Sequence, residues 1–136
     1  MPIAKEYDLP IWDLTLDRVA GDLSAKQFYL VKLSGTTTVA LGAAATNELL
    51  GVLQNKPTTT ADPPTIRMLG LSKCVAGAAV AVGAKITSDA SGKGVTASPS
   101  AGVTNCTVGY ALTSAAADGD TFTVCLTGPY LFQTAD

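Results

Sequence analysis

Residues 107–128 read TVGYALTSAAADGDTFTVCLTG, and this stretch predicts the fold. Thr107–Leu112 and Thr121–Leu126 are rich in β-branched and aromatic residues, and the second run alternates polar with apolar side chains. That composition and a two-residue period are typical of β-strands. Between the two runs, Ala117-Asp118-Gly119-Asp120 is typical of a turn. The stretch therefore predicts two strands joined by a short loop.

Short runs of the same kind continue towards the N-terminus, separated by Gly, Ser, Thr, Asp and Pro. No long stretch has the 3.6-residue period of an amphipathic helix, and only Ala43–Ala45 and Ser114–Ala117 could form a helical turn. Many short strands at close spacing are typical of a sandwich or barrel. We therefore predict an all-β fold with further strands over Trp12–Asp17, Phe28–Leu33, Thr37–Leu41, Leu49–Leu53, Thr65–Leu69, Val80–Thr87 and Val95–Ala97.

The chain also contains an internal repeat. When Gly51 is placed on Gly109, an offset of 58 residues (109 − 51), ungapped matches run through both halves in the same order. Such a repeat predicts two tandem β-units that close one small barrel or sandwich and cover each other's strand edges. We place the halves at about residues 19–72 and 75–130, and divide the chain into an N-terminal arm with a first strand over residues 1–23 and a single β-domain over residues 24–136. The matched pairs include Ala43 with Ala101, Thr46 with Thr104, Asn47 with Asn105, Asp62 with Asp120, Thr65 with Thr123 and Gly70 with Gly128.

The composition favours a surface of low charge. Apolar residues make up 47% of the 136 residues and charged residues 15%, with a net charge of −2. The nine Lys and Arg residues form no basic run, so we expect no nucleic-acid partner. The weakly polar run Val75–Ala84 is too short to cross a bilayer, and the first residues lack the apolar core of a signal peptide. We therefore expect no membrane partner and synthesis in a cytoplasm.

Side chains for catalysis or metal binding are scarce. The chain has no histidine, which removes the commonest general base and metal ligand, and its three cysteines have no CxxC spacing. We interpret the cysteines as small apolar core residues. Asp118 and Asp120, in a Gly-containing turn, are more typical of backbone caps than of a catalytic pair. Ser91-Gly92-Lys93-Gly94 lacks the spacing of a phosphate loop and predicts a hairpin turn. We therefore predict no catalytic residues, no cofactor and no metal site.

The N-terminal segment holds the candidate partner-binding residues. Within residues 1–23, Lys5 and Arg18 stand against five acidic residues, for a local net charge of −3 (2 − 5). From Trp12 to Asp17, apolar residues alternate with Asp and Thr, which predicts a strand with one apolar and one acidic face. For Trp12, whose ring could anchor a partner, packing over the protein's own fold is the alternative. The predicted partner-binding residues are Trp12, Asp13, Leu14 and Asp17.

Three stretches of the second half carry a family resemblance. Residues 77–87 read GAAVAVGAKIT, residues 108–112 read VGYAL, and residues 115–124 read AAADGDTFTV, with Gly128 after them. This order of a Val-Gly-x-Ala-Leu strand, an Ala-rich acidic turn and an alternating final strand resembles the small capsid cement proteins of tailed phages. The resemblance covers roughly residues 19–130, and Ala117-Asp118-Gly119-Asp120 departs slightly from the turn of that family.

The resemblance implies a tulip-like β-barrel or sandwich that forms homotrimers on a phage head, with the major capsid protein as partner and no catalytic residues. We therefore expect a virion protein that binds the outer surface of the capsid and stabilises the shell by bridging capsomers. The alternative is a head-fibre or tail module that binds host-surface carbohydrate or receptor, which the low charge and the Thr-rich loop Lys56–Pro64 would suit. An enzyme that uses carboxylates is a third hypothesis.

Overall fold

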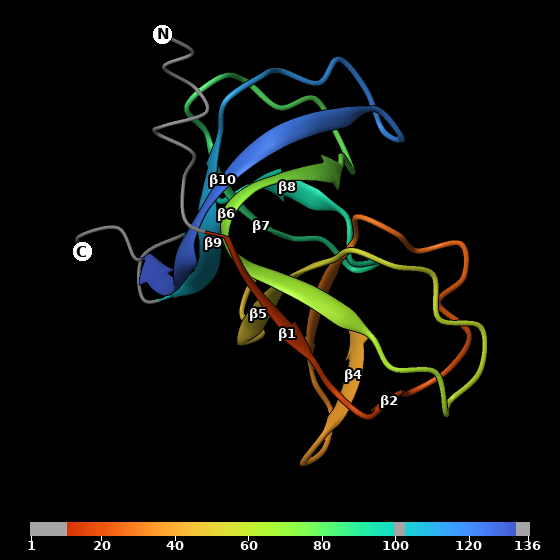
Figure 1. Ribbon diagram of the computed structural model, residues 1–136. Helices are drawn as coiled ribbons and strands as arrows, with labels where there is room; N and C mark the ends of the chain where they lie inside the picture. The colour runs from red at the N-terminus through yellow and green to blue at the C-terminus, as the bar shows by residue number, and fades with distance from the viewer. Residues whose placement is uncertain (1–10, 100–102, 133–136) are drawn as a thin grey trace, which may run out of the picture.

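The computed structural model describes residues 11–99 and 103–132, and these residues form strands, turns and loops (Figure 1). Neither Ala43–Ala45 nor Ser114–Ala117 contains helix, and no helix that could cross a membrane is found in this part of the chain. The prediction of an all-β fold is therefore confirmed. The strands are β1 (Trp12–Thr15), β2 (Arg18–Val19), β3 (Leu30–Leu33), β4 (Thr38–Leu41), β5 (Leu49–Leu53), β6 (Thr65–Val75), β7 (Lys85–Ser88), β8 (Gly94–Thr96), β9 (Asn105–Ala111) and β10 (Thr121–Phe132).

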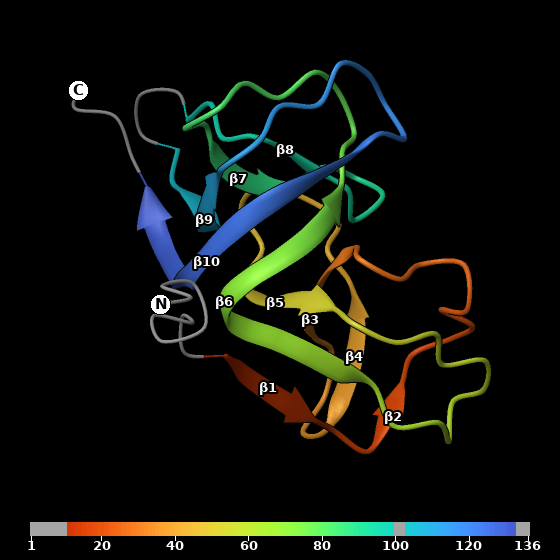
Figure 2. The same ribbon diagram turned by 45° about the horizontal axis from the view of Figure 1, so that its top comes forward.

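The ten strands form one folded sheet in the order β2-β4-β3-β5-β6-β10-β9-β7-β8, and β1 pairs with β6 beside this path. Strands β2 and β8 end the order, so the sheet does not close into a complete barrel. Strands β2 to β5 lie in one half of the molecule and β7 to β9 in the other, and β6 and β10 run side by side where the halves meet (Figure 2).

Strand β6 is longer than the sequence predicted, because it continues through a bend. Its first part pairs with β5 and β1, and its second part, Gly70–Val75, pairs with β10. The bend lies at Gly70, whose φ of 105° is in the left-handed region that glycine adopts without a Cβ penalty. The single strand therefore belongs to both halves (Figure 2). In contrast, β7 is shorter than the predicted Val80–Thr87, and Val80 forms only an isolated bridge with Ala115.

The repeated aspartates have the same hydrogen bonds in both halves. The Oδ2 atom of Asp62 accepts from the backbone N–H groups of Thr58 at 2.8 Å and Thr59 at 3.0 Å. The Oδ2 atom of Asp120 accepts from the backbone N–H groups of Ala116 and Ala117, both at 3.1 Å. Each partner in the second half lies 58 positions after its counterpart, so the repeat seen in the letters is also a repeat of structure.

The aligned glycines also have equivalent surroundings. A Cβ on Gly51 would clash with the backbone oxygen of Arg67, and a Cβ on Gly109 would clash with that of Cys125. Arg67 and Cys125 are again 58 residues apart (125 − 67). At both places the neighbouring strand approaches so closely that only a residue without a side chain fits.

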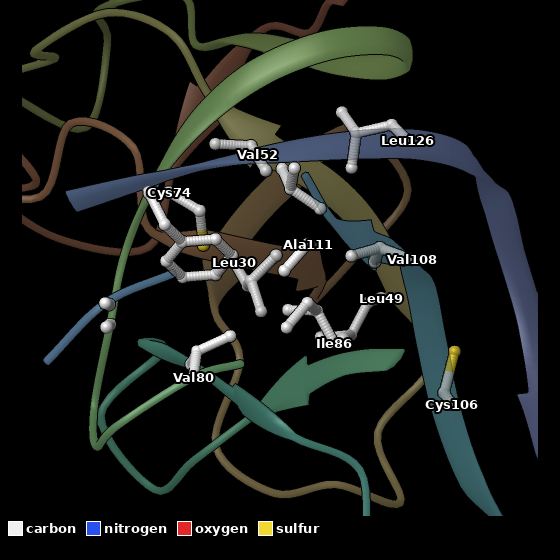
Figure 3. Close-up of a cluster of buried hydrophobic side chains, with 14 residues drawn as sticks. Leu30, Leu49, Val52, Cys74, Val80, Ile86, Cys106, Val108, Ala111 and Leu126 are labelled. Carbon is white, nitrogen blue, oxygen red and sulfur yellow. The ribbon is translucent and has the colours of Figure 1, made fainter. Parts of the chain in front are cut away.

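The two halves share the larger of two hydrophobic clusters. Leu30, Leu49 and Val52 from the first half meet side chains of the second half, among them Ile86 and Val108 (Figure 3). The smaller cluster lies within the first half, around Val19, Leu23, Val31, Val39, Leu53 and Ile66. Because the larger cluster needs both halves, neither half buries all of its apolar residues alone.

The cysteines are all free. Cys74 and Cys106 are buried, as predicted, and burial raises the pKa of the Cys74 thiol to about 12. Cys125 is only partly buried, because it lies on the outer side of β10. The interpretation as core residues therefore holds for two of the three.

The turn at Asp62 makes part of the stability depend on pH. A hydrogen bond from the Thr58 hydroxyl, and then bonds from the backbone N–H groups of Thr59 and Thr58, lower the pKa of Asp62 from 3.8 to about 2. A carboxylate whose pKa is lower in the folded than in the unfolded state stabilises the fold above the unfolded pKa, and this contribution is lost as the pH falls through the folded pKa. Below about pH 2 Asp62 is protonated, and its side chain is then uncharged like that of asparagine.

We therefore expect Asp62→Asn to lower the melting temperature at pH 6, and the difference from the unsubstituted protein to vanish near pH 2. Thermal melts followed by circular dichroism between pH 6 and pH 1.5 measure this difference. A difference that stays constant over the whole range would contradict the assignment, because it would not follow the ionisation of Asp62.

Candidate docking surface

The predicted partner-binding residues lie on and just after β1, at the margin of the first half. Strand β1 pairs antiparallel with the first part of β6, with Leu14 opposite Ile66 and Thr15 opposite Thr65. The backbone N–H of Leu16 donates to Pro64 at 3.1 Å and extends this pairing by one residue. The described part of the arm is therefore attached to the sheet along one edge.

Among the side chains that the structure describes, Trp12 is the most exposed large apolar one, with 68% of its surface accessible. Most of the ring is therefore available for contact with a partner. A register shift between Trp12 and Asp13 places Trp12 opposite Leu69 and Asp13 opposite Arg67. Two neighbouring residues of β1 thus face residues of β6 that are two positions apart, which leaves Met68 as the extra residue of a bulge in β6. From Asp13 to Asp17 the exposure alternates along the chain: Asp13, Thr15 and Asp17 are exposed, whereas Leu14 and Leu16 are half-buried.

Asp13 forms an ion pair with Arg67 through two hydrogen bonds. Nε of Arg67 donates to Oδ1 at 2.9 Å and Nη2 donates to Oδ2 at 3.2 Å. The third contact of this guanidinium is Nη1, which donates to the backbone oxygen of Leu71 at 2.9 Å. Both side chains are partly exposed, so the pair contributes at most about 1 kcal/mol. Arg67 thus attaches β1 to the bend of β6 and neutralises one acidic residue of the arm.

Leu14 and Asp17 have different positions. Leu14 is half-buried, as is Leu16, which packs against the smaller hydrophobic cluster. Asp17 is exposed between β1 and β2 and is followed by the exposed Arg18. The structure therefore leaves Trp12 and Asp13 exposed on β1, leaves Leu14 half-buried, and places Asp17 beyond the strand.

A further apolar group on the outer face was not singled out from the sequence. Leu71, Cys125 and Tyr110 are opposite one another on β6, β10 and β9. Leu71 is 39% and Tyr110 40% exposed. A hydrogen bond with Cys125 raises the pKa of Tyr110. We call these three residues the outer row. The alternation within each strand could have predicted from the sequence that these residues point outwards. The order of the strands, which brings the three together, could not be predicted in this way.

A shallow hollow of about 320 Å³ lies beside the bend of β6. Phe28, Gln54, Leu71 and Ser72 contribute to its lining together with the cations Arg67 and Lys73. The Nζ atom of Lys73 lies 5.8 Å from the centroid of the Phe28 ring. No group of three Cys, Asp or Glu side chains that could hold a metal occurs in residues 11–99 and 103–132. The hollow offers contact area and positive charge.

The two carboxylates considered for catalysis are engaged in turns. Asp118 accepts a hydrogen bond from Nζ of Lys93 at 2.7 Å, and Asp120 caps the N–H groups of Ala116 and Ala117. Ser91-Gly92-Lys93-Gly94 connects β7 and β8, which pair as a hairpin. The interpretation as a backbone cap is therefore confirmed for Asp120, whereas Asp118 forms an ion pair with Lys93 instead. The interpretation of the glycine-rich segment as a hairpin turn is also confirmed.

The described residues thus form an all-β fold of two similar halves, with an exposed tryptophan on a marginal strand and with Asp118 and Asp120 both paired. A family model described as phage cement protein matches residues 13–126. The chain belongs to the phage cement protein family, as the resemblance of its second half predicted.

Solved structures add a similar fold. The crystal structure of the head fiber gp8.5 N base of bacteriophage phi29 is similar to this chain with a TM-score of 0.61 at 20% sequence identity. The match covers 87% of this chain and 95% of the phi29 chain. At this identity the similarity concerns the fold. A search of curated proteins found no match.

Proposed function

We propose that this cement protein binds the major capsid protein on the outside of a phage head, as a homotrimer that bridges neighbouring capsomers. The match of residues 13–126 to the cement family carries the role on the capsid. The exposed Trp12 and the acidic residues of the arm support the choice of contact surface. The work of the protein is then adhesion, and it needs no catalytic residue.

Three copies of a weak site explain how a protein of 13.8 kDa can hold a shell together. A small contact must overcome the association entropy, so one copy alone adds little net binding free energy. In a trimer on a locally three-fold position, the second and third sites bind at a high effective concentration once the first is bound. The trimer then links neighbouring capsomers and resists forces that separate them.

The binding experiment uses purified shells that lack the cement protein. We expect the added chain to bind these shells and to raise the temperature or the force at which they break. The alternative role is a head-fibre or tail module that binds host-surface carbohydrate or receptor, and the phi29 neighbour is itself named a head-fiber base. Binding to glycans or host cells without binding to shells would favour this alternative.

The charge of the arm predicts docking that depends on salt. We expect binding to shells to weaken as NaCl is raised from about 50 to about 500 mM, because the acidic arm meets a basic patch and salt screens charges near the surface. We also expect deletion of residues 1–16 to weaken binding by at least about tenfold. Co-sedimentation of labelled protein with shells measures both effects.

Asp17→Lys and Glu48→Lys form a matched pair for this test, since each reverses one exposed acidic residue. Asp17→Lys should weaken docking and reduce its dependence on salt. Glu48→Lys, just before β5, should leave both nearly unchanged. Equal effects of the two substitutions, or unchanged binding after the deletion, would show that the arm is not the docking element.

A further inference from the structure

The pairing of β1 with β6 is repeated in the pairing of the second part of β6 with β10. Asp13, Leu14 and Thr15 of β1 pair with Arg67, Ile66 and Thr65 of β6. Leu71, Ser72 and Lys73 of β6 pair with Cys125, Val124 and Thr123 of β10. Adding 58 to every residue of the first set produces the second set, so the register is identical. In both places a short segment pairs with, and so covers, the edge of the first part of a long strand. The short segments are β1 and the second part of β6, and the long strands are β6 and β10.

The last part of β10 occupies the same place in the repeat as β1 and as the second part of β6. Residues 129–131 lie 58 positions after residues 71–73, and they follow Gly128, whose φ of 90° resembles the 105° of Gly70. Tyr130, Leu131 and Phe132 pair with β9 on one side. Among the described residues, no strand pairs with their opposite edge. An open edge of this kind is a template for a further strand.

Both equivalent edges are already paired within the same chain. Thr65–Leu69 is covered by β1, and Thr121–Leu126 is covered by the second part of β6. Of these two contacts, the one with β1 is the easier to exchange. Strand β1 has four residues, its ion pair is partly exposed, and its Trp12 is 68% exposed. Neither hydrophobic cluster includes a β1 residue among its buried members, so vacating the edge of Thr65–Leu69 uncovers the smaller cluster only where Leu16 packs against it.

We propose that copies of this chain join head to tail through strand exchange: the open edge of β10 in one copy pairs antiparallel with Thr65–Leu69 of a second copy, in place of the second copy's β1. The repeat sets the register, with Tyr130 opposite Ile66 and Leu131 opposite Thr65 of the other copy. This contact joins two different surfaces, so it forms a ring where the rotation closes. Each junction releases one β1 strand from its sheet. The contact between copies does not depend on the shell as partner.

A disulfide between copies tests the register. We would combine Thr65→Cys with Leu131→Cys in a background of Cys106→Ala and Cys125→Ser, because Cys106 lies opposite Leu131 in the same copy. Mild oxidation should link copies through these two positions, as seen by non-reducing electrophoresis. The matched control combines Thr65→Cys with Phe132→Cys, which moves one sulfur to the other face of the strand, and should give at least about tenfold less linked product. Equal linkage in both, or none in either, would overturn the proposal.

Deletion of residues 1–16 provides an independent measurement. Because it vacates the edge of Thr65–Leu69, self-association in the absence of shells should strengthen by at least about tenfold in analytical ultracentrifugation. Tyr130→Pro, added to the deletion, should return the protein to the monomer, because proline removes an N–H from the strand. Tyr130→Val should retain the association. Melting curves of each variant verify the fold.

A deletion variant that stays monomeric, or one that associates equally well with Tyr130→Pro, would contradict strand exchange. Neither experiment contains shells. Failure of this inference therefore shows in the absence of linkage between copies, whereas failure of the proposed function shows in the absence of binding to shells.

Discussion

Gly109→Ala should lower the free energy of unfolding by about 3 kcal/mol or more, which for a domain of this size is a large part of its total stability. The added methyl group would clash with the backbone oxygen of Cys125 on the neighbouring strand β10. A backbone atom in a paired strand cannot rotate away as a side chain can, so β9 and β10 would have to separate. Urea unfolding followed by tryptophan fluorescence or circular dichroism measures the loss.

Two further substitutions show whether the close strand approach is the cause. Gly51→Ala should have a similar effect, because its Cβ would clash with the backbone oxygen of Arg67 at the equivalent place in the first half. Gly21→Ala is the matched control, since a Cβ there meets no atom within 4 Å, and it should change stability by less than about 0.5 kcal/mol. Three equal values would show that the strand approach is not what selects glycine.

Trp12→Ala should weaken binding to shells by about 30-fold or more, which corresponds to the 2 kcal/mol or more of a tryptophan hot spot. The reason is that the ring, 68% exposed in the isolated chain, would lose most of its contact with water in the docked complex. The same exposure means that the substitution should leave the melting temperature nearly unchanged. Titration of shells with labelled protein measures the affinity.

Val82→Ala is a control for the loss of an exposed apolar side chain. Val82 is 67% exposed and lies just before β7, in the other half of the molecule. We expect its affinity for shells to stay within about twofold of the unsubstituted protein, as for the energetically neutral majority of surface positions. A loss of melting temperature in Trp12→Ala, without a loss of affinity, would assign Trp12 to stability and not to docking.

Local patterns predicted the individual strands well. Leu49–Leu53 forms a strand with the predicted bounds, and the strand predicted over Thr37–Leu41 begins one residue later. Asp62 and Asp120 cap equivalent turns, as their place in the repeat suggested. These features depend on residues within a few positions of one another, which a single sequence displays directly.

The candidate surface was less predictable. The alternation at Trp12–Asp17 indicated a strand, but it did not reveal the bulge in β6 opposite this strand or the ion pair of Asp13 with Arg67. The outer row brings together Leu71, Tyr110 and Cys125, which lie far apart in the chain. Pairing between such distant residues leaves no mark in the local pattern of either strand, so the row could not be found before the strand order was known.

The division between the two kinds of information follows from the range of the forces involved. Alternation, turn residues and the 58-residue repeat depend on residues that are neighbours in the sequence or equivalent in the repeat. They were enough to predict an all-β protein of two similar halves. Long-range pairing set which edge each strand uses: β6 bends at Gly70 to join the halves, β1 takes the edge of Thr65–Leu69, and β10 keeps an edge unpaired among the described residues. Backbone hydrogen bonds between strands are nearly independent of side-chain identity, so only the packed molecule selects among the possible partners.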